Sequence, residues 1–221
     1  MILNVAKTSF LSPMFHFTGL SGLLLLGGGG DSQYSAELWV PGDNQLCRLP
    51  NIGCSINNPT CWDGGMMEGA SVGWLGGAVY ACYMFKCFIL TASGWEAGPD
   101  LMNKRQGSRS VVTSQGLLIT GGFHDSLKTT EVVSETGSKS SFQLSSEMQM
   151  HCIIQTSSSS IVLIGGSRNP SQVLEYSGLD GPDAGVTSTA LPNLNIGRDR
   201  HGCGSYEHHG TLVGSSLVSD T

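Results

Sequence analysis

The densest group of side chains able to do chemistry lies at residues 201–209, with the sequence HGCGSYEHH. His201 and Cys203 alternate, so they would share one face of a strand, and His208 follows from the next turn. Imidazole nitrogen and thiolate sulfur are ligands that zinc favours, which makes these three residues one hypothesis for a metal site. The competing interpretation is a structural His201 with His208 and His209 on an exposed turn. We favour the structural interpretation and assign no catalytic, metal-binding or cofactor-binding residue.

Other catalytic patterns are weaker still. The run Gly27–Gly30 is not followed by Gly-Lys-Ser/Thr, so it does not form a phosphate-binding P-loop. Cys203 has no assignable base that would activate it as a nucleophile, because His201 lies on the same strand. The sequence therefore gives no acid, base or nucleophile set to which we would assign a reaction.

The cysteines leave two interpretations of the cellular compartment open. The chain has seven, at positions 47, 54, 61, 82, 87, 152 and 203, and no CxxC pair. An odd number leaves at least one thiol unpaired. Buried structural thiols would fit a reducing compartment, whereas disulfides would indicate a secreted or extracellular protein.

Composition narrows the fold class and the partners. Of 221 residues 31 are Gly, only 13% are charged, and the formal net charge is -6. This composition disfavours coiled coils and disordered chains and is typical of many short strands joined by turns. With 11 basic and 17 acidic residues, we expect no nucleic-acid partner. The uncharged run 69–85 is barely long enough to cross a bilayer and contains several Gly and Ser, so we expect no membrane span.

A repeat of about 45 residues organises these features. An apolar run closes on a glycine pair four times, and the second glycines stand at positions 28, 77, 122 and 166. Nine residues later comes an acidic residue in three repeats and Lys86 in the other. The repeated residues are Gly27, Gly28, Glu37, Gly76, Gly77, Gly121, Gly122, Glu131, Gly165, Gly166 and Glu175. Because the glutamates recur by repeat position, we interpret them as architectural.

Each repeat is expected to form four short strands, with the glycine pair at the end of the second strand. Glycine permits positive φ and close backbone approach at that point. A single four-stranded sheet cannot bury both of its faces, so neighbouring repeats must stack. The sequence thus predicts an all-β fold of the β-propeller type.

The pattern resembles the kelch repeat, in which a Gly-Gly strand end precedes an acidic residue next to an aromatic, then Trp and Leu-Pro. Glu175-Tyr176, Arg198 and His201 carry this signature best, and Trp95 keeps the Trp element. The resemblance covers about residues 15–213. It implies a kelch-type propeller of four four-stranded blades plus a partial fifth.

The expected boundaries follow from the repeats. Residues 1–14 form an N-terminal extension and 15–221 the propeller, with blades at about 15–52, 62–102, 108–148, 151–194 and 201–218. Kelch propellers usually have more blades than this, so we expect an incomplete propeller or a fragment, with an open sheet edge.

In this register Cys152 and Cys203 occupy nearly equivalent positions on adjacent blades, where a disulfide would be sterically feasible. Cys82 and Cys87 could pair across a hairpin. Isolated buried thiols remain the alternative, and extracellular localisation is favoured only if the cysteines pair.

The resemblance implies a non-enzymatic scaffold that binds an unidentified protein partner, through loops that vary freely on a propeller rim. It implies no cofactor. Two alternatives stay open: a propeller-class enzyme similar to the copper-radical galactose oxidase, and a nonfunctional truncated fragment.

Overall fold

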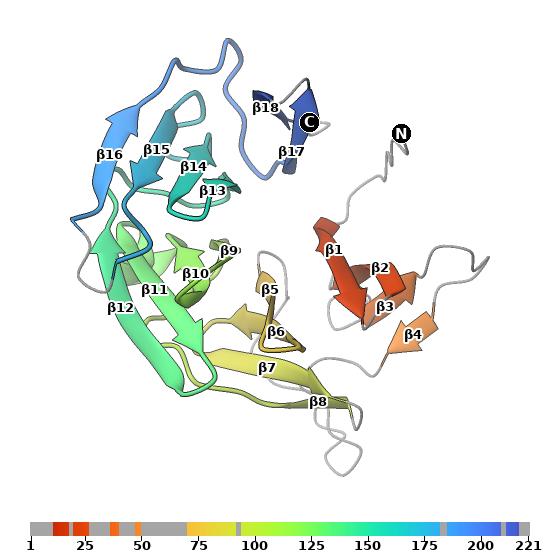
Figure 1. Ribbon diagram of the computed structural model, residues 1–221. Coiled ribbons are helices and arrows are strands. Elements are labelled where there is room, and N and C mark those ends of the chain that lie inside the picture. Colours follow the sequence, from red (N-terminus) through yellow and green to blue (C-terminus); the bar gives the residue numbers. More distant parts are fainter. Residues whose placement is uncertain are drawn as a thin grey trace.

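The computed structural model in Figure 1 describes only part of the 221-residue chain. The described ranges are 11–17, 20–26, 36–39, 47–49, 70–91, 94–181, 185–208 and 211–216. Side chains are described at residue 37 and, apart from residue 125, in 70–91, 94–181 and 185–203.

The described strands form five antiparallel sheets, in which strands pair in chain order. The first sheet contains β1 (Leu11–Phe17), β2 (Leu20–Leu26), β3 (Ala36–Trp39) and β4 (Cys47–Leu49). The second contains β5 (Ser71–Leu75), β6 (Ala78–Tyr83), β7 (Lys86–Thr91) and β8 (Gly94–Ala97). The third contains β9 (Arg109–Thr113), β10 (Gly116–Thr120), β11 (Thr129–Ser134) and β12 (Gly137–Gln143), with the short 3-10 helix η2 (His124–Ser126) before β11.

The fourth sheet contains β13 (Cys152–Ser157), β14 (Ser160–Ile164), β15 (Val173–Ser177) and β16 (Thr187–Ala190). The fifth contains β17 (Cys203–His208) and β18 (Thr211–Ser216). No α-helix occurs in the ranges that the structure describes.

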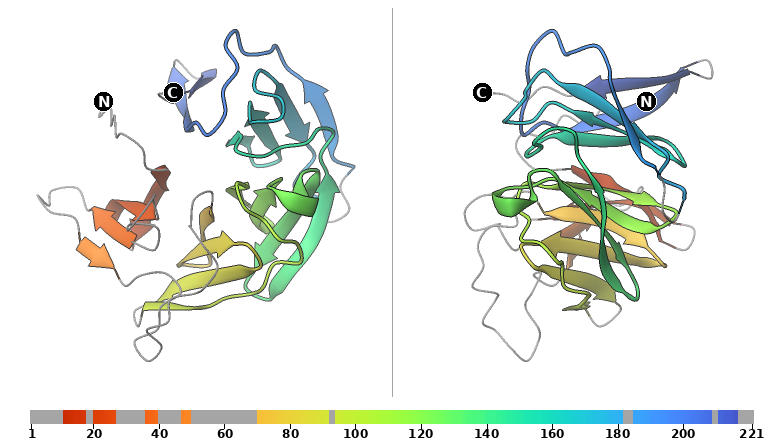
Figure 2. Two further views of the ribbon diagram at one scale, coloured as in Figure 1. Left: turned by 180° about the vertical axis from the view of Figure 1, so that it is seen from behind. Right: turned by 90° about the vertical axis from the view of Figure 1, so that its left-hand side faces the viewer.

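The sheets fan out around a common centre in an open arc (Figure 1). The first strand of each sheet lies innermost, and β9 contacts both β5 and β13. Viewed from the side, the sheets stack face to face (Figure 2). This arrangement is β-propeller-like, and the described strands do not close a ring.

The core lies between the sheets because successive side chains of a strand point to opposite faces. In β10, Leu117 and Ile119 pack towards the second sheet against Tyr80. The intervening Leu118 packs towards the fourth sheet, in the cluster of Ile161. Both faces of the third sheet are therefore buried at β10, as stacking of the repeats requires, whereas its outer strand β12 is largely exposed.

The observed strands differ from one predicted domain boundary, and they show what the uncharged run 69–85 forms. β1 begins at Leu11, inside the predicted N-terminal extension 1–14. The later sheets start and end inside the ranges expected for them. The run 69–85 contributes β5 and β6. Within the described residues, no helix has the length and apolar character needed to cross a membrane.

Candidate functional site: the crossover loops

Within the described ranges, three long loops lead from the outer strand of one sheet to the inner strand of the next. We call 98–108, 144–151 and 191–202 the crossover loops. Backbone hydrogen bonds place Arg105, Met148 and Arg198 at equivalent positions within them. In each case a backbone amide of the preceding sheet donates to the carbonyl oxygen. Met84 N donates to Arg105 O at 2.7 Å, Gly122 N to Met148 O at 2.9 Å, and Gly166 N to Arg198 O at 2.8 Å.

The crossover loops are also joined to one another close to the centre of the arc. Gly107, Met150 and Arg200 each lie two residues after those positions and have φ of 67°, 51° and 52°. Arg200 N donates to Met150 O and Met150 N donates to Gly107 O, both at 2.8 Å. A left-handed residue thus recurs in successive loops because this backbone ladder requires it.

The glycine pairs at 121–122 and 165–166 have the close backbone approach predicted for them. A Cβ on Gly121 would collide with Met148 O, and one on Gly165 would collide with Arg198 O. All four glycines have positive φ. The missing side chain lets the next crossover loop lie directly on the strand end.

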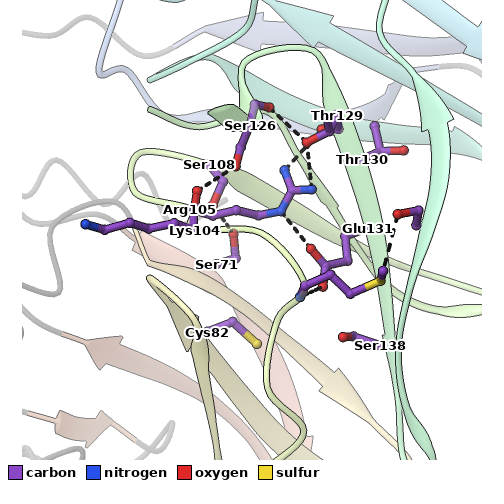
Figure 3. Close-up of polar contacts among 12 residues, drawn as sticks. Ser71, Cys82, Lys104, Arg105, Ser108, Ser126, Thr129, Thr130, Glu131 and Ser138 are labelled. Atoms are coloured by element: carbon purple, nitrogen blue, oxygen red, sulfur yellow. Dashed lines mark hydrogen bonds and ion pairs between the residues drawn. The ribbon is translucent and has the colours of Figure 1, made fainter. Parts of the chain in front are cut away.

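A buried ion pair anchors the crossover loop that precedes the third sheet (Figure 3). Arg105 Nε donates to Glu131 Oε2 at 3.1 Å, and both side chains are fully enclosed. The guanidinium also donates to Gly121 O and to Thr129 O and Oγ1. Glu131 Oε1 accepts from Met102 N at 2.5 Å. Burial lowers the pKa of Arg105, while the charge and hydrogen bond of Glu131 oppose that shift.

The equivalent place in the fourth sheet is apolar. Glu131 pairs with Ile119, two residues before Gly121, whereas Leu174 pairs with Leu163, two residues before Gly165. Leu174 and Met148 lie in one buried cluster. The Arg105–Glu131 pair is thus replaced by Met148–Leu174.

This register corrects the expectation for Glu175. Gly121 N bonds to Thr129 O, eight residues on, whereas Gly165 N bonds to Gln172 O, only seven residues on. The shorter connection shifts Glu175 by one position, so it pairs with Val162 and faces the other side of its sheet. Glu131 and Glu175 are therefore equally distant in sequence from their glycine pairs but lie on opposite faces of their sheets.

Gly76 and Gly77 are a second correction. They form the two-residue turn between β5 and β6, with φ of 59° and 85°, and not the end of a second strand. Gly-Gly is a favoured sequence for such hairpin turns. Where the third and fourth sheets have their glycine pairs, the second has the turn residues Met84 and Phe85.

A buried polar residue recurs three positions after Arg105, Met148 and Arg198. These residues are Ser108, His151 and His201, and we call them the polar column. In the third sheet Ser108 Oγ lies 2.9 Å from Ser71 Oγ. In the fourth, His151 Nε2 lies 2.8 Å from Thr120 Oγ1, which donates to Arg109 O. The hydroxyl can therefore accept a hydrogen bond from Nε2–H.

His201 continues this column into the fifth sheet without an equivalent partner. It is 2% exposed, and neither ring nitrogen has a hydrogen-bond partner among the described residues. The residue equivalent to Thr120, immediately before the glycine pair, is Ile164. Ile164 thus has no hydroxyl like the one that Thr120 offers to His151.

Both histidines are neutral near pH 7. Burial lowers the pKa of His151 to about 3, helped by the charge of Arg109 and by repulsion from His201 when that ring is protonated. Burial likewise lowers the pKa of His201 to about 4, with further lowering by Arg109 and Arg198 and an opposing effect of Asp199. These groups are better suited to packing than to proton transfer at neutral pH.

The remaining predicted positions are structural or outside the described side chains. Trp95 is buried in β8, in a cluster with Val72. Tyr176 is buried and its hydroxyl bonds to Ser145 at 2.9 Å. Glu37 lies in β3 opposite Leu25. Gly27 and Gly28 lie outside the described residues.

The structure brings together both cysteine pairs named from the sequence. Cys82 and Cys87 form a disulfide across β6 and β7, with Cα atoms 4.0 Å apart. Cys152 and Cys203 form a disulfide between the inner strands of the fourth and fifth sheets, with Cα atoms 6.0 Å apart. Cys203 thus has no thiolate for the zinc hypothesis. No cluster of three metal-binding side chains occurs among the described residues.

Exposed apolar side chains mark one face of the arc. The exposed large hydrophobic residues of the described part are Phe85 at 46%, Met102 at 57% and Ile196 at 68%. Phe85 is in the β6–β7 turn, and the other two are in crossover loops. Antiparallel order places all three at the same ends of the strands, which we call the crossover face. Leu101 N bonds to Phe85 O, so the segments of Phe85 and Met102 are neighbours.

A pocket of about 460 Å³ opens on the opposite face, between the third and fourth sheets. Gln115 lines it and donates to Leu179 O and Gly181 O at 2.9 and 2.8 Å. Its floor is the apolar pair Leu118 and Val132. No titratable pair suited to acid–base chemistry lines this pocket.

Sequence reasoning missed Arg105 and His151. The sequence did contain a signal for Arg105. It stands three residues before Ser108, just as Arg198 stands three residues before His201. The glycine pair of the second repeat was assigned to the wrong turn, which hid this spacing.

Comparisons with known proteins add a fold and no function. No protein-family model matches the chain, and no curated protein matches it. Among the matching solved structures, that of YjhT is 11% identical with a TM-score of 0.60. The match covers 95% of this chain and 72% of that one. At this identity the likeness is one of fold alone.

Proposed function

We propose that this chain is a non-enzymatic protein-interaction scaffold built on kelch-type blades, and that its crossover face binds the partner protein. The observation that carries the proposal is the position of Phe85, Met102 and Ile196, the exposed large hydrophobic side chains of the described part. Exposed apolar residues on the loops at one face of a rigid scaffold favour recognition of another protein.

The buried polar groups support the same interpretation. Arg105, Glu131 and His151 contact other parts of the fold and are fully enclosed. Their role is to hold sheets and loops together. The crossover loops are thereby fixed in position, so that binding a partner would cost little ordering of the backbone.

The kelch assignment is part of the proposal. It is supported by Arg198 and His201 in one crossover loop, by Arg105 at the equivalent place in another, and by glycine pairs at the ends of β10 and β14. The glycine pairs directly follow β10 and β14, and Arg105 and Arg198 lie four and five residues before β9 and β17, respectively.

The experiment compares protein capture by three purified forms of the chain. The Phe85→Ser/Met102→Ser variant removes apolar surface from the crossover face, and Glu135→Ser/Lys139→Ser alters exposed residues away from it. We expect a partner captured by the wild type and the control variant to be lost with the first variant, and direct titration with that purified partner to agree. Equal binding by all three forms would contradict the proposed face. Stoichiometric copper in the purified protein would instead favour the enzyme alternative.

A further inference from the structure

The fifth sheet is attached to the rest of the fold in an unusual way. Among the described strands it consists only of β17 and β18, which pair with one another. A two-stranded hairpin is at best marginally stable by itself. β17 contacts the neighbouring β13 but is not hydrogen-bonded to it as a strand. The hairpin therefore depends on this junction for its position.

Covalent attachment at the junction comes from Cys152–Cys203. The bond joins β13 to β17 across 51 residues of chain. Beside the bond, Arg200 N donates to Met150 O at 2.8 Å, and Cys203 Sγ lies 3.6 Å from Ile153 O. The junction also encloses His201, whose ring nitrogens have no hydrogen-bond partner among the described side chains, which opposes burial.

The second disulfide provides a natural contrast. Cys82 and Cys87 are directly opposed in the β6–β7 ladder and only five residues apart. Their strands are held together without the bond. Both residues are 1% exposed, whereas Cys203 is partly exposed. Cys152–Cys203 is thus the more accessible bond and the one whose loss removes a tertiary connection.

We propose that Cys152–Cys203 is a thiol-sensitive clasp, whose reduction releases the β17–β18 hairpin while the second, third and fourth sheets stay folded. The reductant is a small thiol or dithiol. Its thiolate attacks Cys203 Sγ, the S–S bond breaks, and Cys152 leaves as a thiolate that takes up a proton. A second reductant thiolate then attacks the reductant sulfur of this mixed disulfide, and Cys203 leaves as a thiolate that takes up a proton. The products are two cysteine thiols and one reductant disulfide.

The proposal is tested on the full chain with dithiothreitol as the probe. Thiols are alkylated at increasing reductant concentrations and located by peptide mass, while hydrogen exchange is followed in parallel. We expect Cys152 and Cys203 to be alkylated at lower dithiothreitol than Cys82 and Cys87. Amides of residues 204–216 should then exchange about tenfold faster or more, and those of 116–120 should not change. Reoxidation should restore the protection.

Two variants separate the clasp from general destabilisation. Cys203→Ser should give the fast exchange of 204–216 without reductant, and Cys87→Ser should keep the wild-type pattern. If Cys203→Ser does not fold, reversible reduction of the wild type decides the question. Simultaneous alkylation of all four cysteines, or unchanged exchange of 204–216 after reduction of Cys152–Cys203, would overturn the proposal.

Discussion

Arg105 and Glu131 form a fully enclosed ion pair, 3.1 Å between Nε and Oε2, at the place where the next sheet has Met148 and Leu174. The fold therefore accommodates either a salt bridge or an apolar pair at one repeat position. Removing one member of a buried ion pair leaves an uncompensated charge, whereas replacing both with apolar groups is often tolerated.

The two single variants should consequently be less stable than the double variant. Arg105→Met alone and Glu131→Leu alone should each lower the free energy of unfolding by about 3–5 kcal/mol. Arg105→Met/Glu131→Leu should recover most of that loss, since it copies Met148–Leu174, although the Met102 amide and the oxygens of Gly121 and Thr129 lose the hydrogen bonds that the ion pair makes. Urea unfolding of the four proteins measures the coupling. Additive losses in the double variant would contradict the equivalence of the two positions.

Ile164→Thr should stabilise the junction of the fourth and fifth sheets by about 1 kcal/mol, because it offers His201 the hydroxyl that Thr120 offers His151. The reverse change, Thr120→Ile, should cost about 1–3 kcal/mol by leaving His151 Nε2 unpaired. Thermal unfolding compares both with the wild type. A destabilising Ile164→Thr would show that His201 is not within reach of that position.

Acid should destabilise the fold through the two buried histidines. Their folded-state pKa values, about 3 and about 4, lie below the ordinary 6.5, so the unfolded chain takes up protons first as the pH falls. Their contribution is complete above pH 6.5 and is lost progressively as the pH falls, towards about 4 for His201 and about 3 for His151. His201→Asn should remove about 3 kcal/mol of this pH dependence. Denaturant midpoints at several pH values test the prediction, and parallel profiles for the two proteins would refute it.

Gly121→Ala should be far more damaging than Gly77→Ala, although both glycines have positive φ. A Cβ at Gly77 meets nothing within 4 Å, so only the backbone conformation costs, about 1–2 kcal/mol. At Gly121 the Cβ meets Met148 O, which must move together with the crossover loop. We expect a loss of several kcal/mol there, measured by urea unfolding. Similar losses would mean that the loop yields easily.

The all-β repeat organisation and the places of most strands could be predicted from the sequence, because glycine pairs and apolar runs are local signals. The register could not. Gly76-Gly77 and Gly121-Gly122 come after similar apolar runs, yet one is a hairpin turn and the other a strand end. The two cases differ in the residues after the glycines, because Ala78 begins another β-like run at once, whereas Phe123 begins a loop.

The candidate site was predicted only in part for a similar reason. Glu131 was identified by its spacing, but its partner Arg105 was not, since the two are joined across a crossover loop and 26 residues of chain. Glu175 has the same spacing and a different face, because the connection from its glycine pair to β15 is one residue shorter. Such a one-residue shift in register cannot be found by counting residues in the sequence. It is seen only in the pairing of β14 with β15.

The ladder through Gly107, Met150 and Arg200 joins three chemically unrelated residues by the same backbone bonds. Mutation can therefore exchange side chains at these points while the connection between neighbouring repeats is inherited unchanged. In such a chain, the backbone hydrogen bonds between repeats could be conserved in homologues long after the residue types have diverged. Distant relatives are then better sought by the backbone hydrogen bonds between successive crossover loops than by matching residue types.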